Sequence, residues 1–392
     1  MSNDTQPEIR FPGFTDDWEQ RKLGELANHR GGTAIEKYFK EDGKYKVISI
    51  GSYGLDSKYV DQNIRAVSNK VTDSRVVRTG ELTMVLNDKT ANGTIIGRSL
   101  LIEEDNKYVI NQRTEIISPK ENFDSNFAYV LLNGPFREKV KRIVQGGTQI
   151  YVNYNAVSNL IFKLPDIKEQ KKIGLFFKQL DDTIALQQRK LDLLKETKKG
   201  FLQKMFPKNG AKVPEIRFPG FTENWEEKKF KEVINSGIKG KAKAEMSGTK
   251  SLYLDTNYLN GGVVTYVDSP RDVENDDVLI LWDGSQAGTV YYGFSGALGS
   301  TLKAYRAKES GAFLYQQLKR NQQIIYDRYR TPNIPHVVKT FTDEFMVSMP
   351  SSEEQFKIGT FFKQLDDMIA LQQRKLDLLK ETKKGFLQKM FV

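Results

Sequence analysis

A stretch of 31 residues occurs twice in this chain with a single difference. It reads FFKQLDDTIALQQRKLDLLKETKKGFLQKMF at residues 176–206 and returns at residues 361–391, where Met368 replaces Thr183. The stretch contains no proline, and good helix formers (Leu, Lys, Gln and Glu) dominate it. The sequence therefore predicts two nearly identical helices in one chain, and this duplication constrains the fold more than any other feature.

A hydrophobic seam runs along each predicted helix. Apolar residues alternate at spacings of four and three, the heptad pattern of a coiled coil, with polar interruptions at Gln187 and Lys198. The predicted seam of the helix pair consists of Leu180, Ile184, Leu191, Leu194, Phe201, Leu365, Ile369, Leu376, Leu379 and Phe386. Each helix is expected to span about 38 residues, or about 57 Å at the usual helical rise.

A second, shorter repeat opens each half of the chain. The anchor PEIRFPGFTDDWEQRKL at residues 7–23 returns as PEIRFPGFTENWEEKKF at residues 214–230, whereas the sequences between anchor and helix differ. Similar anchors and nearly identical helices around different variable regions predict two antiparallel helices related by an approximate two-fold axis. The alternative is that each helix packs only on its own domain.

The two variable regions follow a similar plan. Short runs rich in Val, Ile, Thr and Tyr lie between Gly, Asn and Asp turns, which is typical of strands. One helix is predicted at about residues 127–145, and its counterpart at residues 311–329. The expected fold is α+β: two α/β domains in tandem (residues 1–164 and 208–349), each with its own core. They are separated by two long antiparallel coiled-coil helices (residues 165–207 and 350–392) in a pseudo-two-fold internal repeat.

The composition limits the chemistry of the chain. Among 392 residues there is no cysteine and there are two histidines, which excludes disulfides and thiol catalysis and argues against a histidine-built metal site. The sequence has no P-loop motif and no Asn-Pro-Pro-Tyr motif of amino-methyltransferases. It also has no apolar run of about 18 residues and no apolar signal segment, so a cytoplasmic location is expected.

The charge balance favours a polyanionic partner. The formal net charge is +10 and the isoelectric point is near 9.3, which points first to nucleic acid. Arg, Asn and Gln match base edges in the major groove, and Lys, Ser, Thr and Tyr suit phosphate oxygens. Residues of these types in the predicted loops are candidate DNA contacts: Ser52, Tyr53, Asn87, Lys89, Asn92, Thr148, Gln149, Lys239, Lys241, Asn257, Ser285, Gln286, Arg330, Thr331 and Asn333.

Several motifs, in the same order in both halves, resemble the specificity (S) subunit of type I restriction–modification enzymes. They are RFPGF…W…KLGEL at residues 10–26, VQGGTQ at 144–149, LPDIKEQKKIG at 164–174 and LLKETKKGFLQKMF at 193–206 and 378–391. The second half departs from this pattern with YRTPN at residues 329–333, so contact residues are not transferred between halves.

This resemblance implies two target recognition domains, each reading one half of a bipartite double-stranded DNA target. It also implies that the helices set the spacing and bind two methyltransferase (modification) subunits, which restriction and translocase subunits join. The chain would then have no catalytic site, metal or cofactor of its own. As part of a type I restriction endonuclease and adenine DNA methyltransferase, it would leave S-adenosylmethionine, ATP and Mg to its partner subunits.

Two other functions fit the sequence less well. A tandem DNA-binding regulator without enzyme partners does not explain why the repeats are so nearly identical. A nuclease would use Asp166 with Glu196 and Lys198, but Ser351 stands at the position of Asp166 in the second half. The acidic pairs at residues 181–182 and 366–367 are interpreted as favourable charges near helix N-termini.

Overall fold

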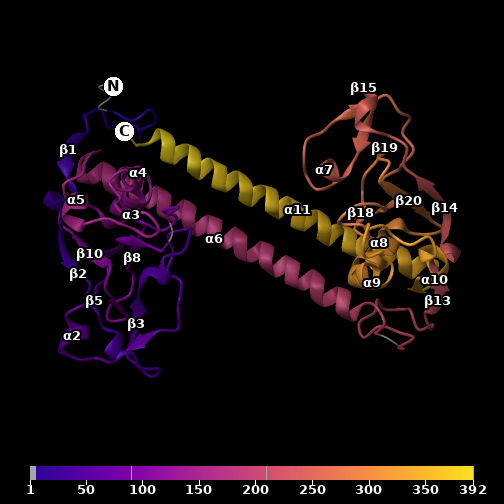
Figure 1. Cartoon of the computed structure of the whole chain (residues 1–392), viewed down its shortest axis with the longest axis horizontal. Coiled ribbons are helices and arrows are strands. Elements are labelled where there is room, and N and C mark those ends of the chain that lie inside the picture. The colour runs from indigo at the N-terminus through magenta and orange to yellow at the C-terminus, as the bar shows by residue number, and fades with distance from the viewer. Residues whose placement is uncertain (1–5, 90, 209, 392) are drawn as a thin grey trace. The chain divides into compact units, whose positions relative to one another are not determined.

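The protein divides into two compact units, which Figure 1 shows in a computed structural model. The structure describes residues 6–89, 91–208 and 210–391. Unit 1 comprises residues 1–187 and 375–392, and unit 2 comprises residues 188–374. Each unit therefore contains one globular region, the first part of one long helix and the last part of the other.

Unit 1 is built from three sheets, a two-stranded ribbon and several helices. Its strands are β1 (Glu19–Lys22), β2 (Ala27–Gly31), β3 (Tyr45–Ile48), β4 (Arg65–Ala66), β5 (Val76–Val77), β6 (Leu82–Val85), β7 (Asn87–Asp88), β8 (Ser99–Leu101), β9 (Tyr108–Ile110), β10 (Thr114–Pro119), β11 (Ile150–Tyr151) and β12 (Ile161–Leu164). Its helices are α1 (Leu23–Leu26), α2 (Lys70–Asp73), α3 (Ser125–Asn133), α4 (Pro135–Lys141) and α5 (Tyr154–Ser158), and the long helix α6 (Ile167–Lys204) begins here.

Unit 2 is built on the same scheme. Its strands are β13 (Glu226–Lys229), β14 (Ile234–Lys239), β15 (Ser247–Leu254), β16 (Tyr266–Val267), β17 (Val278–Leu281), β18 (Val290–Tyr292), β19 (Ala297–Leu298), β20 (Leu302–Ala307) and β21 (Met346–Met349). Its helices are α7 (Thr256–Leu259), α8 (Gly311–Arg320), α9 (Gln322–Arg328) and α10 (Phe341–Glu344), and the long helix α11 (Ser352–Lys389) begins here.

The central sheets of the two units share one topology. The strand order is β2-β10-β6-β8 in unit 1 and β14-β20-β17-β18 in unit 2, and every neighbouring pair is antiparallel. In each unit a two-stranded ladder joins the end of the anchor to the strand before the long helix, β1 with β12 and β13 with β21. The predicted common plan of the two variable regions is therefore confirmed.

The two long helices match their predicted length and pairing. Helices α6 and α11 each contain 38 residues, and all ten predicted seam residues are buried or half-buried. In unit 1 the start of α6 contacts the end of α11, with the rings of Phe176 and Phe386 5.0 Å apart. In unit 2 the corresponding rings of Phe361 and Phe201 are 5.1 Å apart. The helices thus run antiparallel within each unit, and the alternative that each packs only on its own domain is wrong.

The helix predicted at residues 127–145 is instead two short helices. Helix α3 ends at Asn133 and α4 begins at Pro135, with Gly134 between them. Proline lacks the N–H that a continuous helix would use, so it starts a new helix more readily than it continues an old one. The counterpart in unit 2 is also divided, into α8 and α9, which meet at Asn321.

Each core is completed by the end of a long helix that starts in the other unit. The main core of unit 1 includes Met390 and Phe391, which follow α11. The main core of unit 2 includes Met205 and Phe206, which follow α6. The two main cores are separate, and each also includes residues that follow a long helix from the other unit, which the sequence did not indicate. No helix in the described residues has an apolar stretch long enough to cross a membrane.

Candidate nucleic-acid interface and helix junctions

An arginine from each anchor holds the first turn of each long helix. In unit 1, Nε and Nη2 of Arg10 donate hydrogen bonds of 2.8 Å to the two carboxylate oxygens of Glu169, whose side chain is 1% exposed. In unit 2, Arg217 makes the same fork to Glu354 at 2.7 Å. Hydrogen bonding to these carboxylates raises the pKa of both arginines. Such bidentate charged pairs fix orientation as well as distance, so both junctions hold their helix in the same way.

A cluster of aromatic rings surrounds each junction. In unit 1 the ring of Phe176 lies 5.9 Å from Phe11 of the anchor and packs edge-on against Phe386. The equivalent cluster of unit 2 consists of Phe218, Phe361 and Phe201. The same residues at the same places in both units indicate one duplicated structure rather than two similar ones.

A glycine lets a short helix approach the start of each long helix. A Cβ atom on Gly174 would lie 2.6 Å from the backbone nitrogen of Phe127, at the start of α3. A Cβ atom on Gly359 would lie 2.9 Å from the nitrogen of Phe313, at the start of α8. Both distances are too short for a side chain, so glycine is required at these repeated positions.

The lysines that interrupt the seam, Lys198 and its counterpart Lys383, form ion pairs between the long helices. Lys198 donates to Asp366 at 2.5 Å in unit 2, and Lys383 donates to Asp181 at 2.6 Å in unit 1. The interpretation of the acidic pairs as helix-dipole partners is wrong, because α6 begins at Ile167 and the dipole acts within the first turn. These aspartates instead join one long helix to the other.

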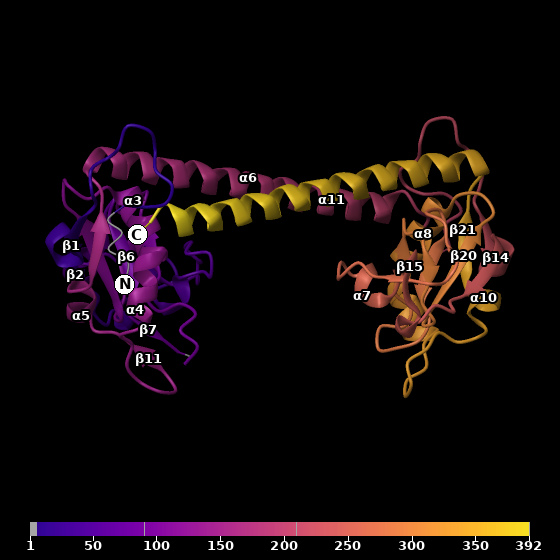
Figure 2. The ribbon, with the colours of Figure 1, turned by 90° about the horizontal axis from the view of Figure 1, so that it is seen from above.

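Five of the seven candidate DNA contacts of unit 1 lie around one small ribbon. Strand β7 carries half-buried Asn87 and pairs with β11, and Figure 2 shows the two strands side by side. Lys89 and Asn92 are exposed in the loop after β7, and Thr148 and Gln149 are exposed in the turn before β11. The ribbon therefore presents charged and amide side chains together at one edge of the unit.

Two of the candidates do not reach the surface. Ser52 is fully buried and donates to the backbone oxygen of Val47. Tyr53 is 3% exposed, donates to Thr83 at 2.9 Å, and has its pKa raised by burial. Their hydroxyl groups serve the core, so the structure removes both from the candidate DNA contacts.

Unit 2 carries a different loop surface. The turn with Ser285 and Gln286 is joined to the loop before Val337, since Arg330 donates to the backbone oxygen of Ser285 at 3.2 Å. Arg330 also lies over the ring of Tyr326, and Thr331 is half-buried and hydrogen-bonded within its loop. Asn333 is exposed in that loop.

The remaining three candidates of unit 2 are exposed, and two of them lie away from that turn. Lys239 ends β14. Lys241 is bound through its backbone to Leu298 of β19, and Asn257 belongs to α7. In Figure 1, α7 lies near β15 and β19 and away from α9, so these two candidates form a separate group.

Comparison with known proteins places the whole chain in one family. The profile of the family described as "Type I restriction modification DNA specificity domain" matches residues 15–196 and again residues 222–381. The chain belongs to this family. The two matches of this type I specificity family fall on the two halves of the internal repeat, and each contains one variable region and most of one long helix.

Similar proteins agree with the family. The type I restriction enzyme MjaVIII specificity subunit of Methanocaldococcus jannaschii is 30% identical over 195 residues, which cover 47% of this chain and 44% of that protein. The chain thus spans less than half the length of this curated relative.

Solved structures of the family share the fold. A type I restriction–modification system S subunit from M. genitalium has a TM-score of 0.73 at 17% identity, with 99% of both chains covered. A chain from a structure of type I R-M complex assembly and conformational transition has a TM-score of 0.50 at 18% identity, covering 98% of this chain and 99% of that one.

Two lysines outside the predicted contacts of this specificity-family protein have pKa values lowered by burial and by neighbouring positive charges. In unit 2, burial and then the charges of Lys239 and Lys339 lower the pKa of Lys303, whose ammonium lies 3.4 Å from the ring centre of Trp282. In unit 1, Lys139 has its pKa lowered by burial and then by the charges of Arg142 and Lys163. These lysines are spread over strands and helices, so no local sequence pattern could group them.

Proposed function

We propose that this chain is the DNA-sequence-specificity subunit of a type I restriction–modification complex, with each unit reading one half of a bipartite target. One observation carries the proposal. The junction of anchor and helix is duplicated in the two units, whereas the loop surfaces of the two units differ. Identical junctions serve one kind of partner twice, whereas dissimilar loops read different sequences. The loop surfaces supply amide and cationic side chains of the kinds that contact bases and phosphates.

The partners follow from the same division of roles. The long helices and anchors bind two methyltransferase subunits and set the spacing between the half-sites. Restriction and translocase subunits join this complex. S-adenosylmethionine, ATP and Mg are held by the partner subunits, and this chain contributes recognition without a catalytic group. The complex acts in the cytoplasm.

Replacing residues 226–349 with the matching region of a relative is expected to change one half of the DNA target only. Glu226 of β13 pairs with Met349 of β21, so the two ends of this region lie side by side. A replacement region can therefore be joined to the chain without moving the strands on either side. The anchor arginine and both long helices stay unchanged. Mapping methylated adenines in cells that carry the chimera with its methyltransferase is the test.

The matched control is the exchange of residues 19–164, because Glu19 and Leu164 are partners in the equivalent ladder. It is expected to change the other half-site and leave the first one intact. A change in both half-sites, or the loss of methyltransferase binding, would show that recognition is not divided between the units.

DNA binding is expected to weaken steeply with salt. Contacts from Lys and Arg to phosphates release counterions, and about six contacts give a slope near −5 in a plot of log affinity against log salt concentration. Titrating fluorescent duplex DNA at several salt concentrations measures this slope. A slope near zero would show that the net charge of +10 serves something other than DNA.

A further inference from the structure

Three lysines gather at one end of the central sheet of unit 2. Lys239 ends β14 and lies directly opposite Lys303 of β20 in the strand register. Lys239 and Lys339 both contribute positive charge that lowers the pKa of Lys303, after the larger effect of burial. Like charges placed opposite one another in a sheet are destabilising. The fold therefore holds these lysines together against their repulsion, which an anion between them would offset.

The ring of Trp282 fixes the position of the central lysine. The ammonium of Lys303 lies 3.4 Å from the ring centre, and Trp282 is 5% exposed. Such a cation–π contact positions the charge without neutralising it. The described residues give none of the three lysines an ion pair, and the carboxylate of Asp283 acts on Lys303 less strongly than the charge of Lys239 does. The cluster thus keeps its positive charge.

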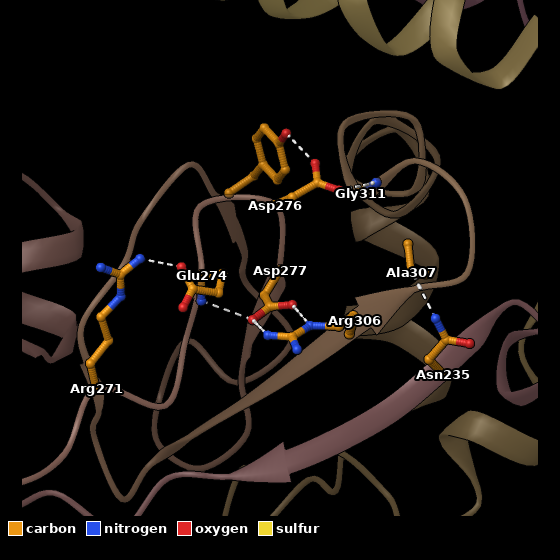
Figure 3. Close-up of polar contacts among 9 residues, drawn as sticks. Asn235, Arg271, Glu274, Asp276, Asp277, Arg306, Ala307 and Gly311 are labelled. Atoms are coloured by element: carbon orange, nitrogen blue, oxygen red, sulfur yellow. Dashed lines mark hydrogen bonds and ion pairs between the residues drawn. The ribbon is translucent and has the colours of Figure 1, made fainter.

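Near the other end of β20, a basic side chain is matched within the fold. Nε and Nη2 of Arg306 donate to the two carboxylate oxygens of Asp277 at 2.9 and 3.0 Å (Figure 3). Beside this pair, Asn235 of β14 donates to the backbone oxygen of Ala307 at 3.4 Å. Arg306 therefore serves the internal structure of the sheet, whereas the charge of Lys303 is left for a ligand.

The lysine cluster adjoins the loop surface of unit 2. Trp282 closely precedes the turn that carries Ser285 and Gln286. The backbone nitrogen of Val337 donates to the oxygen of Trp282 at 2.8 Å, and Lys339 follows two residues later. Phosphate contacts position a protein on DNA, and base contacts specify the sequence. Lysines beside loops with amide side chains are therefore suited to hold the backbone while the loops contact bases.

The equivalent place in unit 1 carries the opposite charge. Glu115 is the second residue of β10 and lies opposite Gly31 of β2. Lys303 is the second residue of β20 and lies opposite Lys239 of β14. Glu115 is 6% exposed, and its Oε1 lies 2.7 Å from Nδ1 of His29. A carboxylate at this place repels a phosphate. Two units with one topology thus present opposite charges at one structural position.

We propose that Lys239, Lys303 and Lys339 form a site for a phosphate of the DNA backbone in unit 2, and that the position of Glu115 in unit 1 binds none; this rests on the proposed function. Each ammonium group is a compact charge with three donors, which suits the oxygens of a phosphate. Burial strengthens the attraction of Lys303 for an anion, because the local dielectric is lower than that of water. The two half-sites are then held by unequal backbone contacts.

The test uses the full chain with its methyltransferase subunit, a duplex carrying the mapped target, and the variant Lys239→Gln with Lys339→Gln. Both lysines are exposed, so the variant should fold with an unchanged melting temperature. We expect the affinity for the target to fall about tenfold, and the slope of log affinity against log salt concentration to become shallower by about two. The methylated sequence should stay the same, because phosphate contacts carry no sequence information.

The matched control is Lys228→Gln with Lys308→Gln. These substitutions remove the same charge from unit 2, but they lie beside the start of α11 and among the carboxylates of Glu226, Glu232 and Glu309. The affinity for the target should stay within about twofold of wild type, with an unchanged salt slope. A wild-type slope in the cluster variant, an equal loss in the control, or a changed methylated sequence would overturn the inference.

Ethylation of single phosphates locates the contact on the DNA. In the half-site read by unit 2, some ethylated phosphates should weaken binding by the wild type and have no effect on the cluster variant. Interference in the half-site read by unit 1 should be the same for both proteins. Interference that is lost in both half-sites, or in neither, would contradict a phosphate site confined to unit 2.

Inorganic phosphate and ATP test whether the ligand is a free phosphate compound instead of DNA. Calorimetry with either should show no micromolar binding to the wild-type chain, since neither is also held by the loops. A micromolar site that the cluster variant loses, with DNA binding unchanged, would overturn the inference. A wild-type complex that binds the target no better than unrelated DNA would contradict the proposed function itself, and the inference fails with it.

Discussion

The double substitution Leu191→Glu with Leu376→Glu is expected to abolish methyltransferase assembly and bipartite DNA recognition together. The two leucines are equivalent positions of the repeat and are 1% and 0% exposed. Losing each buried side chain costs about 2 to 3 kcal/mol, and placing a carboxylate in the seam adds a further cost. The total approaches the whole stability of an ordinary domain, so the helix pair should open.

The globular regions should keep weak binding to their own half-sites, because the substitutions leave unchanged the residues after each long helix that complete the two main cores. Footprinting on DNA with defined half-site spacing, with co-purification of the methyltransferase, measures both effects. The control, Asp192→Lys with Asp377→Lys, changes exposed positions of the same helices and should leave the fold intact. If the seam variant still requires the wild-type spacing, the helix pair does not set it.

The long-range architecture was predictable because the sequence repeats itself. The heptad seam predicted two helices of about 38 residues, and both have that length. The repeated anchors predicted equivalent structures in the two halves, and the forks of Arg10 and Arg217 show the same junction in each unit. Repetition removes ambiguity, since a pattern that occurs twice in the same order is much less easily explained by chance.

Local structure and burial were less predictable. The pair Gly134–Pro135 signals a break between α3 and α4, but the apolar run around it continues on both sides and favours one helix. Ser52 and Tyr53 lie in a sequence segment typical of a loop, yet both side chains are buried in the fold. Burial depends on contacts between distant segments, and a single sequence does not display those contacts.

The candidate site was predicted only in part for the same reason. Asn87, Thr148 and Gln149 were predicted from the composition of separate loops. The fold brings them together at one ribbon, although β7 and β11 are far apart in sequence. The repeat indicated that Asp181 and Asp366 are equivalent, but only the fold shows that each ion-pairs with a lysine of the other long helix.

The substitution Phe391→Ala is expected to destabilise unit 1, and Phe206→Ala to destabilise unit 2. Phe391 is 9% exposed, and its ring lies 5.7 Å from Phe127, 6.1 Å from Phe177 and 6.1 Å from Trp18. Truncating a buried phenylalanine to alanine usually costs about 3 to 5 kcal/mol, because a cavity remains where the ring was. For a unit of this size we expect the melting temperature to fall by about 10 °C.

Phe206 is the equivalent ring in unit 2, so Phe206→Ala and Phe391→Ala serve as controls for each other. Phe206 stacks on Phe313 at 5.6 Å and contacts Trp225 and Phe362 at 5.9 and 5.8 Å. Hydrogen–deuterium exchange resolved by segment should show faster exchange in β6, β10 and α3 for Phe391→Ala. It should show faster exchange in β17, β20 and α8 for Phe206→Ala. Faster exchange in the same unit for both variants would contradict this assignment. Because each phenylalanine lies just after a helix that begins in the other unit, the expected crossed pattern would show that the two halves complete each other's cores.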